Sequence, residues 1–186
     1  MQDITFEGWP KIPRLNRTMQ ITEKIDGTNA AIIVTDDYYV GAQSRNRLIT
    51  PDDDNAGFAR WVYANSEELA RMLGPGRHFG EWWGSGIQRG YGLSKGEKRF
   101  SMFNVNRYAD TDLSLVPNVA LVPVLYEGPF DNGMVQYILQ SLGSDGSVAA
   151  PGFMRPEGVV VFHTAARTAF KVTIENDESS KGTELT

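Results

Sequence analysis

The sequence predicts an α+β domain built on antiparallel sheets. Short apolar runs rich in β-branched residues recur along the chain, while only two segments show the apolar spacing of a helix. The 186 residues are enough for one sizeable domain, and a hydrophobic content of 41% can fill its core. We therefore expect one domain over residues 1–175, a polar, mobile tail over 176–186, and no separate carboxyl-terminal domain.

The expected elements follow from local patterns. An apolar stripe between residues 56 and 73 predicts a helix, which Gly74-Pro75-Gly76 ends and the acidic loop 52–54 caps. A shorter helix is expected at 132–142. Gln88–Gly92 is polar and glycine-rich, which is typical either of a mobile surface loop or of a flexible loop that touches RNA. The expected strands are 19–24, 29–35, 38–43, 77–84, 100–105, 120–127, 158–163 and 169–174.

Composition narrows the function classes. The chain has no cysteine, which excludes disulfides, thiolate catalysis and cysteine zinc sites and fits a reducing cytoplasm. No apolar run is long enough to cross a bilayer and no secretory signal is visible, so we expect a cytoplasmic protein with no membrane partner. The net charge of −5 counts mildly against a nucleic-acid binder, although a local basic groove can coexist with acidic surroundings.

One lysine stands where a nucleophile would be useful. Lys24 ends an expected strand, and Asp26-Gly27 follows as a tight turn in which glycine lets the backbone approach a bound group. Catalysis near neutrality needs the pKa of a lysine about 2–3 units below its reference of about 10.4, which costs roughly 3–4 kcal/mol. Nearby cations and partial burial are the two means available. By itself, Lys-x-Asp-Gly is a weak signal.

Three other ionisable residues lie in apolar strands. Glu81 falls within Phe79–Gly84, Glu157 begins an apolar run, and Lys171 lies between Phe170 and Val172. Charged groups in such surroundings are costly unless they are paired, so they are better functional candidates than surface charges. His78 and His163 have no metal-ligand spacing and are expected to be structural.

These segments together resemble a known motif series. Lys24-Ile25-Asp26-Gly27, Ser44-Arg45-Asn46, Gly80-Glu81, Phe103-Asn104-Val105, Glu157-Gly158-Val159-Val160 and Lys171 occur in the order found in the covalent nucleotidyltransferases. That superfamily holds ATP-dependent DNA ligases, RNA ligases and mRNA capping enzymes, and the likeness is closest to RNA ligases of the bacteriophage type. The resemblance covers residues 20–174. It implies the ATP-grasp-like nucleotidyltransferase domain, in which two antiparallel sheets flank an ATP cleft.

The resemblance also implies catalytic roles. Lys24 would attack the α-phosphorus of ATP and carry AMP, which would then pass to a 5′-phosphate RNA end before a 3′-hydroxyl displaces it. Lys171 would neutralise the α-phosphate and keep Lys24 deprotonated. Glu157 would help to hold Mg²⁺ (or Mn²⁺), because this ion prefers carboxylate and water oxygens.

The remaining implied roles concern the nucleotide. Glu23 would hold the adenine edge, Arg45 would contact ribose or phosphate, and Glu81 would bind the ribose hydroxyls. Phe103 would stack on adenine, for which a flat apolar face is required. Asp26, Gly27 and Asn29 complete the nucleotide-binding set that the resemblance implies.

Two departures from the family pattern leave alternatives open. Thr173 stands where relatives often have a second strand lysine, so Arg167 or a cation of the basic arm (residues 1–18) would have to substitute. The nucleic-acid-binding domain common in these ligases is not recognisable, so RNA ends would bind to one domain or with an accessory nucleic-acid-binding protein. A DNA nick ligase and a non-catalytic nucleotide- or RNA-binding remnant stay as alternatives. A capping enzyme is less favoured, because those usually have arginine where Asn29 stands.

Overall fold

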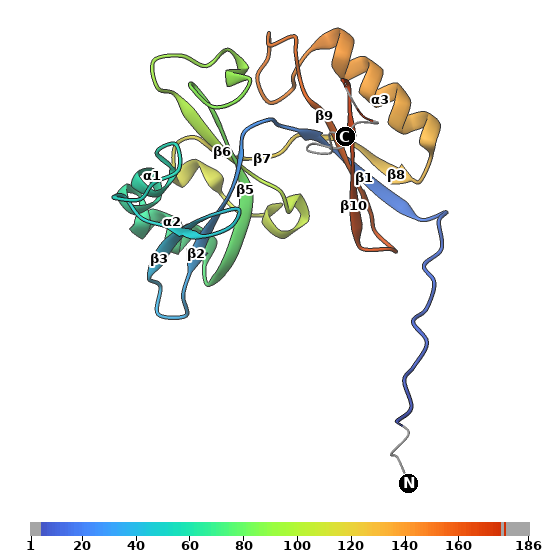
Figure 1. The fold of residues 1–186 in the computed structure, drawn as a ribbon, viewed down its shortest axis with the longest axis horizontal. Helices are drawn as coiled ribbons and strands as arrows, with labels where there is room; N and C mark the ends of the chain where they lie inside the picture. Colours follow the sequence, from blue (N-terminus) through green and yellow to red (C-terminus); the bar gives the residue numbers. More distant parts are fainter. Residues whose placement is uncertain (1–4, 176, 178–186) are drawn as a thin grey trace, which may run out of the picture.

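Two β-sheets make up most of the structure, a computed structural model that describes residues 5–175 and 177. A four-stranded sheet has the order β10-β9-β1-β8 and a six-stranded sheet the order β4-β3-β2-β5-β6-β7. Figure 1 shows the two sheets side by side, with the amino-terminal arm extending away from them. The expected α+β class is confirmed. The expected tail lies outside the described residues, apart from Asp177.

The four-stranded sheet is antiparallel throughout and carries one helix. Residues Met19, Ile21, Val159 and Val161 alternate on one face, where they form a core with the helix α3 (Asn132–Asp145). Asp131 caps α3 by accepting hydrogen bonds from the amides of its first turn. Figure 1 shows α3 on the outer side of the sheet, which leaves the opposite face toward the rest of the molecule. The strands are β1 (Thr18–Lys24), β8 (Val124–Pro129), β9 (Gly158–His163) and β10 (Thr168–Thr173).

The six-stranded sheet is covered by two helices over an aromatic core. Phe58 lies 5.4 Å from Trp82 and 5.2 Å from Phe100 between ring centroids, distances at which aromatic rings pack closely. The pairing is antiparallel except between β6 and β7, which run parallel, so the expectation of purely antiparallel sheets is wrong for this edge. The elements are β2 (Thr28–Val34), β3 (Val40–Ser44), β4 (Leu48–Ile49), α1 (Phe58–Ala64), α2 (Ser66–Leu73), β5 (Gly76–Gly84), β6 (Lys98–Met102) and β7 (Val119–Leu121).

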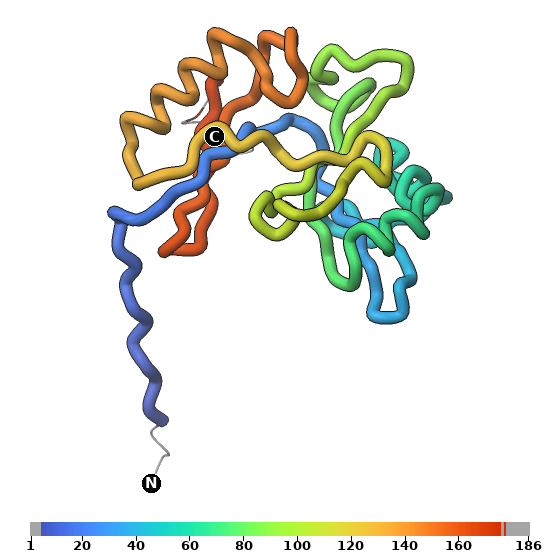
Figure 2. Tube along the Cα trace, turned by 180° about the vertical axis from the view of Figure 1, so that it is seen from behind, coloured from blue at the N-terminus to red at the C-terminus, as the bar shows by residue number. Residues whose placement is uncertain are grey.

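Two expected elements are each divided in the structure. The helix expected at 56–73 is two helices, because Asn65 leaves the helical conformation and its side-chain amide donates to the carbonyl of Trp61 at 2.7 Å. The strand expected at 120–127 is β7 and β8, which belong to different sheets. Pro123 lies at the break, and proline has no amide hydrogen to continue a ladder. Figure 2 shows the chain crossing from one sheet to the other here.

A third apolar cluster fills the place where the chain passes between the sheets. It contains the buried residues Ile25, Trp83, Tyr91, Val122 and Ala150. Ile25 follows directly on β1, so this cluster fixes the position at which β1 ends. Short 3-10 turns complete the fold at Gly90–Gly92, Val105–Tyr108 and Leu113–Leu115. No helix in the described part of the chain is both long and apolar enough to cross a membrane.

Candidate functional site

Lys24, the predicted nucleophile, forms an ion pair with Glu157, the predicted metal ligand. Lys24 is the last residue of β1, and its Nζ lies 2.5 Å from Oε2 of Glu157, 133 residues away in the chain. The pairing of Lys24 with Gly158 across β1 and β9 brings them together, because Glu157 directly precedes β9. The lysine side chain is 25% exposed and the glutamate side chain 7%. The site therefore begins with a largely shielded ion pair that solvent and ligands can still reach.

The turn after Lys24 is held against the six-stranded sheet. The amide of Gly27 donates to Oε1 of Glu81 at 3.0 Å, and the amide of Asp26 donates to the hydroxyl of Tyr91 at 2.9 Å. A Cβ at Gly27 would overlap the carbonyl oxygen of Trp82 and crowd its neighbour. The turn therefore requires glycine for its close approach to β5.

Glu81 is the buried carboxylate of the six-stranded sheet. It pairs with Asn29 across β2 and β5, and the Asn29 side-chain amide donates to its Oε2 at 2.7 Å. Burial raises the pKa of Glu81 to about 7, against the opposing effect of the hydrogen bonds from Asn29 and Gly27 and of the Lys24 charge. The Glu157 charge also raises it. Groups from both sheets thus act on one another electrostatically at this site.

Phe103 and Arg45 lie at the ends of strands of the same sheet. Phe103 follows β6, is 42% exposed, and donates its amide to the carbonyl of Phe79 at 3.0 Å. Its neighbour Met102 is buried in the aromatic core, so alternation puts Phe103 on the other face of the sheet, with Glu81. Arg45 is exposed just after Ser44, which pairs with Ala30 next to Asn29.

Lys171 lies on the same face as Lys24, but in another row of the sheet. Directly paired residues project to the same side, and the row of Lys171 contains Val160 and Thr22. The row of Lys24 contains Gly158 and Thr173. The threonine that replaces the expected second lysine is thus the one aligned with Lys24, while Lys171 is exposed one row away.

Glu23, which the resemblance assigns to the adenine edge, has a carboxylate that is bound inside the protein. Glu23 is 1% exposed and projects to the α3 side of β1, opposite to Lys24. Its carboxylate accepts hydrogen bonds from the Ser147 hydroxyl at 2.6 Å and from the amides of Val148 and Ala149 at 2.9 and 2.8 Å. Those three bonds satisfy both oxygens, so Glu23 anchors the loop after α3.

Arg89 and Tyr91 contact the turn after Lys24, from a loop for which the sequence left open a mobile surface position or contact with RNA. Arg89 Nε donates to Oδ2 of Asp26 at 3.0 Å. Tyr91 is 2% exposed and packs between Trp83 and Phe153, at 5.3 and 4.6 Å between ring centroids. Burial raises the pKa of the Tyr91 hydroxyl, with a further contribution from nearby carboxylates that include Glu157. The sequence showed only that Tyr91 lies between two glycines, and this pattern does not predict where its side chain points.

Both histidines are structural, as predicted. His78 is fully buried, with its ring nitrogens against the Tyr108 hydroxyl at 2.7 Å and the Gly74 carbonyl at 3.0 Å. Burial lowers the pKa of His78. His163 contacts the carbonyl of Leu15 at 2.7 Å.

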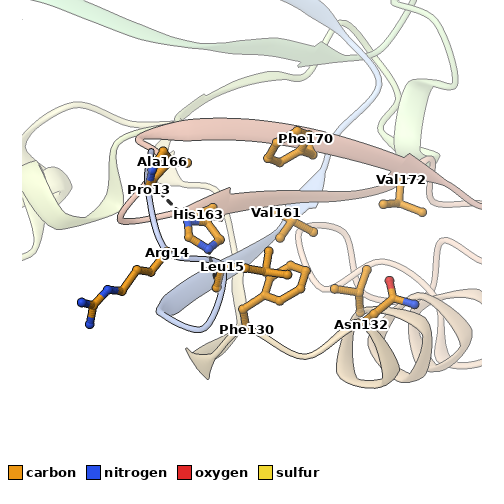
Figure 3. Close-up of a pocket in the computed structure, with 11 residues that line it drawn as sticks. Pro13, Arg14, Leu15, Phe130, Asn132, Val161, His163, Ala166, Phe170 and Val172 are labelled. Carbon is orange, nitrogen blue, oxygen red and sulfur yellow. Dashed lines mark hydrogen bonds between the residues drawn. The ribbon is translucent and has the colours of Figure 1, made fainter. Parts of the chain in front are cut away.

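A separate pocket on the outer face of the four-stranded sheet is apolar. It has a volume of about 340 Å³, and Figure 3 shows Leu15, Phe130, Val161, Phe170 and Val172 among its lining residues. Phe170 and Val172 flank Lys171 in β10, so they project to the face opposite to Lys24. The pocket contains none of the predicted catalytic or nucleotide-binding residues, and Arg14, Asn132 and His163 are its polar lining residues.

The carboxylates at the site could hold a divalent cation such as Mg²⁺ together with the phosphates of a bound nucleotide. One oxygen of Glu157 is paired with Lys24, and Asp26 and Glu81 lie in the same region. Within residues 5–175 and 177, no three or more His, Cys, Asp or Glu side chains gather as a metal cage. Mg²⁺ commonly needs only one or two carboxylates, with water and phosphate oxygens supplying the other ligands.

Comparisons with known proteins show a family and similar folds. A family model described as RNA ligase matches residues 17–173. A Naegleria gruberi RNA ligase variant with ATP and Mn aligns with a TM-score of 0.65 at 19% identity, over 90% of this chain and 53% of that chain. A variant with AMP and Mn gives 0.60 at 18% identity, over 86% and 50%. The ligase with PPi gives 0.62 at 21% identity, over 85% and 50%.

The family model matches most of the chain, whereas the solved structures match it with low sequence identity. No curated protein matches the chain in sequence. The chain spans about half the length of the solved ligases, whose low identity makes them evidence for the fold. The family model covers nearly the whole of the described sequence, and the chain therefore belongs to the RNA ligase family.

Proposed function

We propose that the chain is an ATP-dependent RNA ligase that carries AMP on Lys24. The observation that supports this most directly is the ion pair of Lys24 with Glu157, beside the buried Glu81 of the other sheet. It joins an amine that can become a nucleophile to a carboxylate that can accept its proton. Membership of the RNA ligase family supports the reaction class, and the solved relatives were obtained with ATP, AMP, Mn or PPi.

The proposed reaction has three steps. Neutral Lys24 attacks the α-phosphorus of ATP, so a P–N bond forms and the bond to the pyrophosphate oxygen breaks. A 5′-phosphate oxygen of RNA then attacks the same phosphorus and releases Lys24, which gives a 5′–5′ pyrophosphate linkage. Finally a 3′-hydroxyl attacks the 5′-phosphorus, loses its proton and displaces AMP.

Glu157 is proposed to control the charge of Lys24. Its Oε2 lies 2.5 Å from the amine, within the distance at which a proton passes directly. Lys171 is proposed to add positive charge at the α-phosphate from the same face of the sheet. Once the proton has left Lys24, that positive charge disfavours its return.

The six-stranded sheet is proposed to recognise the nucleoside. Glu81 and Asn29 would bind the ribose hydroxyls, since both present polar atoms at one position of the β2–β5 ladder. Phe103 would stack on adenine with its partly exposed ring. Arg45 would contact ribose or phosphate at the end of β3. Asp26 and Gly27 would shape the turn around the nucleotide.

Glu157 is proposed as the protein ligand of Mg²⁺ or Mn²⁺. A divalent cation supplies charge neutralisation and orientation at transferring phosphates. An incoming cation would compete with Lys24 for the carboxylate of Glu157 and so weaken the ion pair.

Residues 1–175 are proposed as the adenylyltransferase domain. Because the chain spans about half the length of the solved ligases, RNA binding is a separate part of the proposal. RNA ends with a 5′-phosphate and a 3′-hydroxyl would bind at this domain, with an accessory nucleic-acid-binding protein as a possible helper.

Incubation with α-labelled ATP and Mg²⁺ tests the nucleophile. We expect label that stays on the protein through denaturation, is absent from Lys24→Ala, and is unchanged in Lys11→Ala, a lysine of the exposed arm. A wild-type protein that takes no label, or a Lys24→Ala variant that still does, would contradict the proposal. Mass spectrometry of the labelled peptide identifies the modified residue.

Pre-adenylylated protein then tests the substrate. We expect sealing of single-stranded RNA with a 5′-phosphate, seen as a longer or circular product. Efficient sealing of nicked DNA duplexes without RNA sealing would replace the RNA assignment with a DNA nick ligase.

A further inference from the structure

We propose that Arg89 is a phosphate-binding residue for ATP and takes the place of the second strand lysine. The inference rests on the proposed function and deepens it. Arg89 lies in the loop after β5 and donates to Asp26, two residues after Lys24, and to the carbonyl of Arg155, two residues before Glu157. It therefore joins the two segments that bring the ion pair together.

The sheet register shows what the chain lacks at this point. Thr173 pairs with Gly158, which pairs with Lys24, so all three occupy one row. Neighbouring strands lie about 4.8 Å apart, so positions 24 and 173 are about 10 Å apart across the row. A long basic side chain at 173 would reach a phosphate bound at Lys24, whereas the threonine hydroxyl donates to the carbonyl of Glu175 at 2.9 Å.

Neither cation of the β9–β10 hairpin fills that place. Arg167 lies in the turn next to His163, at the end of β9 opposite to Gly158. Five residues separate His163 from Gly158, and a strand rises about 3.3 Å per residue, so this turn lies about 16 Å along the sheet from Lys24. Arg167 is therefore excluded as the substitute. Lys171 is exposed and lies in the next row.

Arg89 has the chemistry and the free capacity for phosphate. A guanidinium has five N–H donors, of which one binds Asp26 and one the Arg155 carbonyl, and Nη2 lies 3.5 Å from the Glu175 carboxylate. The donors that remain are on Nη1 and Nη2, and these two nitrogens can bind phosphate oxygens. The side chain is 20% exposed, so it is fixed by its surroundings and still open to a ligand.

ATP binding to a non-reacting protein tests this inference separately from catalysis. In a Lys24→Ala background with Mg²⁺, we expect Arg89→Ala to weaken ATP binding at least about tenfold by calorimetry, and AMP binding much less. Adding Thr173→Lys should restore most of the ATP affinity from the other sheet. A lysine at 173 cannot rebuild the hydrogen bonds that Arg89 makes to Asp26 and to the Arg155 carbonyl. Restored ATP affinity would therefore show that Arg89 acts by binding phosphate, and not only by holding the Asp26-Gly27 turn in place.

The controls separate the outcomes. Arg167→Ala should leave ATP binding unchanged, and the melting temperature of each variant shows whether it is folded. If wild-type protein takes no label while ATP affinity still depends on Arg89, the ligase proposal fails and this inference stands. ATP affinity that is equal with and without Arg89, or a loss that Thr173→Lys leaves unrepaired in a folded protein, overturns the inference.

Discussion

The two sheets differ in the groups they contribute to the site and in the cores that hold them. The four-stranded sheet carries the charged pair Lys24 and Glu157 over a mainly aliphatic core that includes Met19 and Val161. The six-stranded sheet carries Glu81 and the partly exposed Phe103, and its core is rich in aromatic rings. Groups suited to a reaction thus lie on one sheet, and groups suited to nucleoside recognition lie on the other.

The difference has a consequence for how the site works. The groups proposed for the reaction and those proposed for nucleoside recognition are joined where the chain passes between the sheets, at the Asp26-Gly27 turn. Contacts across this junction, such as Gly27 to Glu81 and Asp26 to Arg89, set the distance between the two sets of groups. A change on the four-stranded sheet should therefore alter mainly the rate of lysyl–AMP formation, and a change on the six-stranded sheet mainly the affinity for ATP. A change at the junction should alter both.

The largest expected effect comes from the four-stranded sheet. Glu157→Gln removes the group proposed to take the proton from Lys24, and we expect lysyl–AMP formation to slow about 10³-fold. ATP affinity should fall much less than the rate, because the proposed cation ligand is lost while the recognition groups on the other sheet are untouched. Rapid-quench measurement of label at several ATP concentrations separates the two quantities. An equal loss of rate and affinity would show that the sheets do not divide these roles.

The next effect concerns the core of the six-stranded sheet. Phe58→Ala empties a fully buried position between aromatic rings and should lower the free energy of unfolding by about 3–5 kcal/mol. Tyr63→Ala on the same helix is the matched control, since Tyr63 is 43% exposed and should change it by less than about 0.5 kcal/mol. Denaturant unfolding measures both. Similar values for the two variants would refute the aromatic core as the main support of this sheet.

The elements that could be predicted are those with a strong local pattern. The strand that ends at Lys24, the one that contains Glu81 and the run after Glu157 were all located, because apolar alternation and flanking turns mark them. Their meeting could not be derived from those patterns, since register between strands depends on distant residues. The motif order supplied that information through its resemblance to a family of known fold.

The failures have different physical causes. The resemblance assigned Glu23 to the adenine edge, and it did not reveal that alternation along β1 sends this side chain to the face opposite to Lys24. The apolar run at 120–127 was predicted as one strand, although Pro123 interrupts it and the structure has two strands there. Arg89 and Tyr91 gain their positions from contacts with Asp26 and Phe153, far away in sequence, which no local pattern encodes.

The raised pKa of Glu81 predicts a pH dependence of the free energy of unfolding. Its pKa is raised from an ordinary value of 4.5 to about 7, so the folded state holds this proton more tightly than the unfolded state. Its stabilising contribution is full below about pH 4.5 and is lost as pH rises through about 7, a change of about 3–4 kcal/mol.

Glu81→Gln should remove this part of the pH dependence of unfolding. Glu97→Gln, which changes an exposed carboxylate paired with Arg99, is the control and should keep the wild-type slope. Denaturant titrations between pH 4.5 and 8 measure the slope. An unchanged slope in Glu81→Gln would mean that Glu81 ionises normally in the folded protein.

The smallest effect tests recognition alone. Phe103→Ala removes a ring proposed to stack on adenine, and we expect the ATP concentration for half-maximal labelling to rise about tenfold, or about 1.4 kcal/mol. The labelling rate at saturating ATP should be nearly unchanged, because Lys24 and Glu157 stay in place. Phe103→Trp should keep the affinity, since any flat ring can stack. Phe162→Ala is the control, because Phe162 is 37% exposed on the four-stranded sheet and pairs with Gln20, well away from the end of β1. A lower saturating rate in Phe103→Ala, with unchanged affinity, would place this ring among the reacting groups and break the division between the sheets.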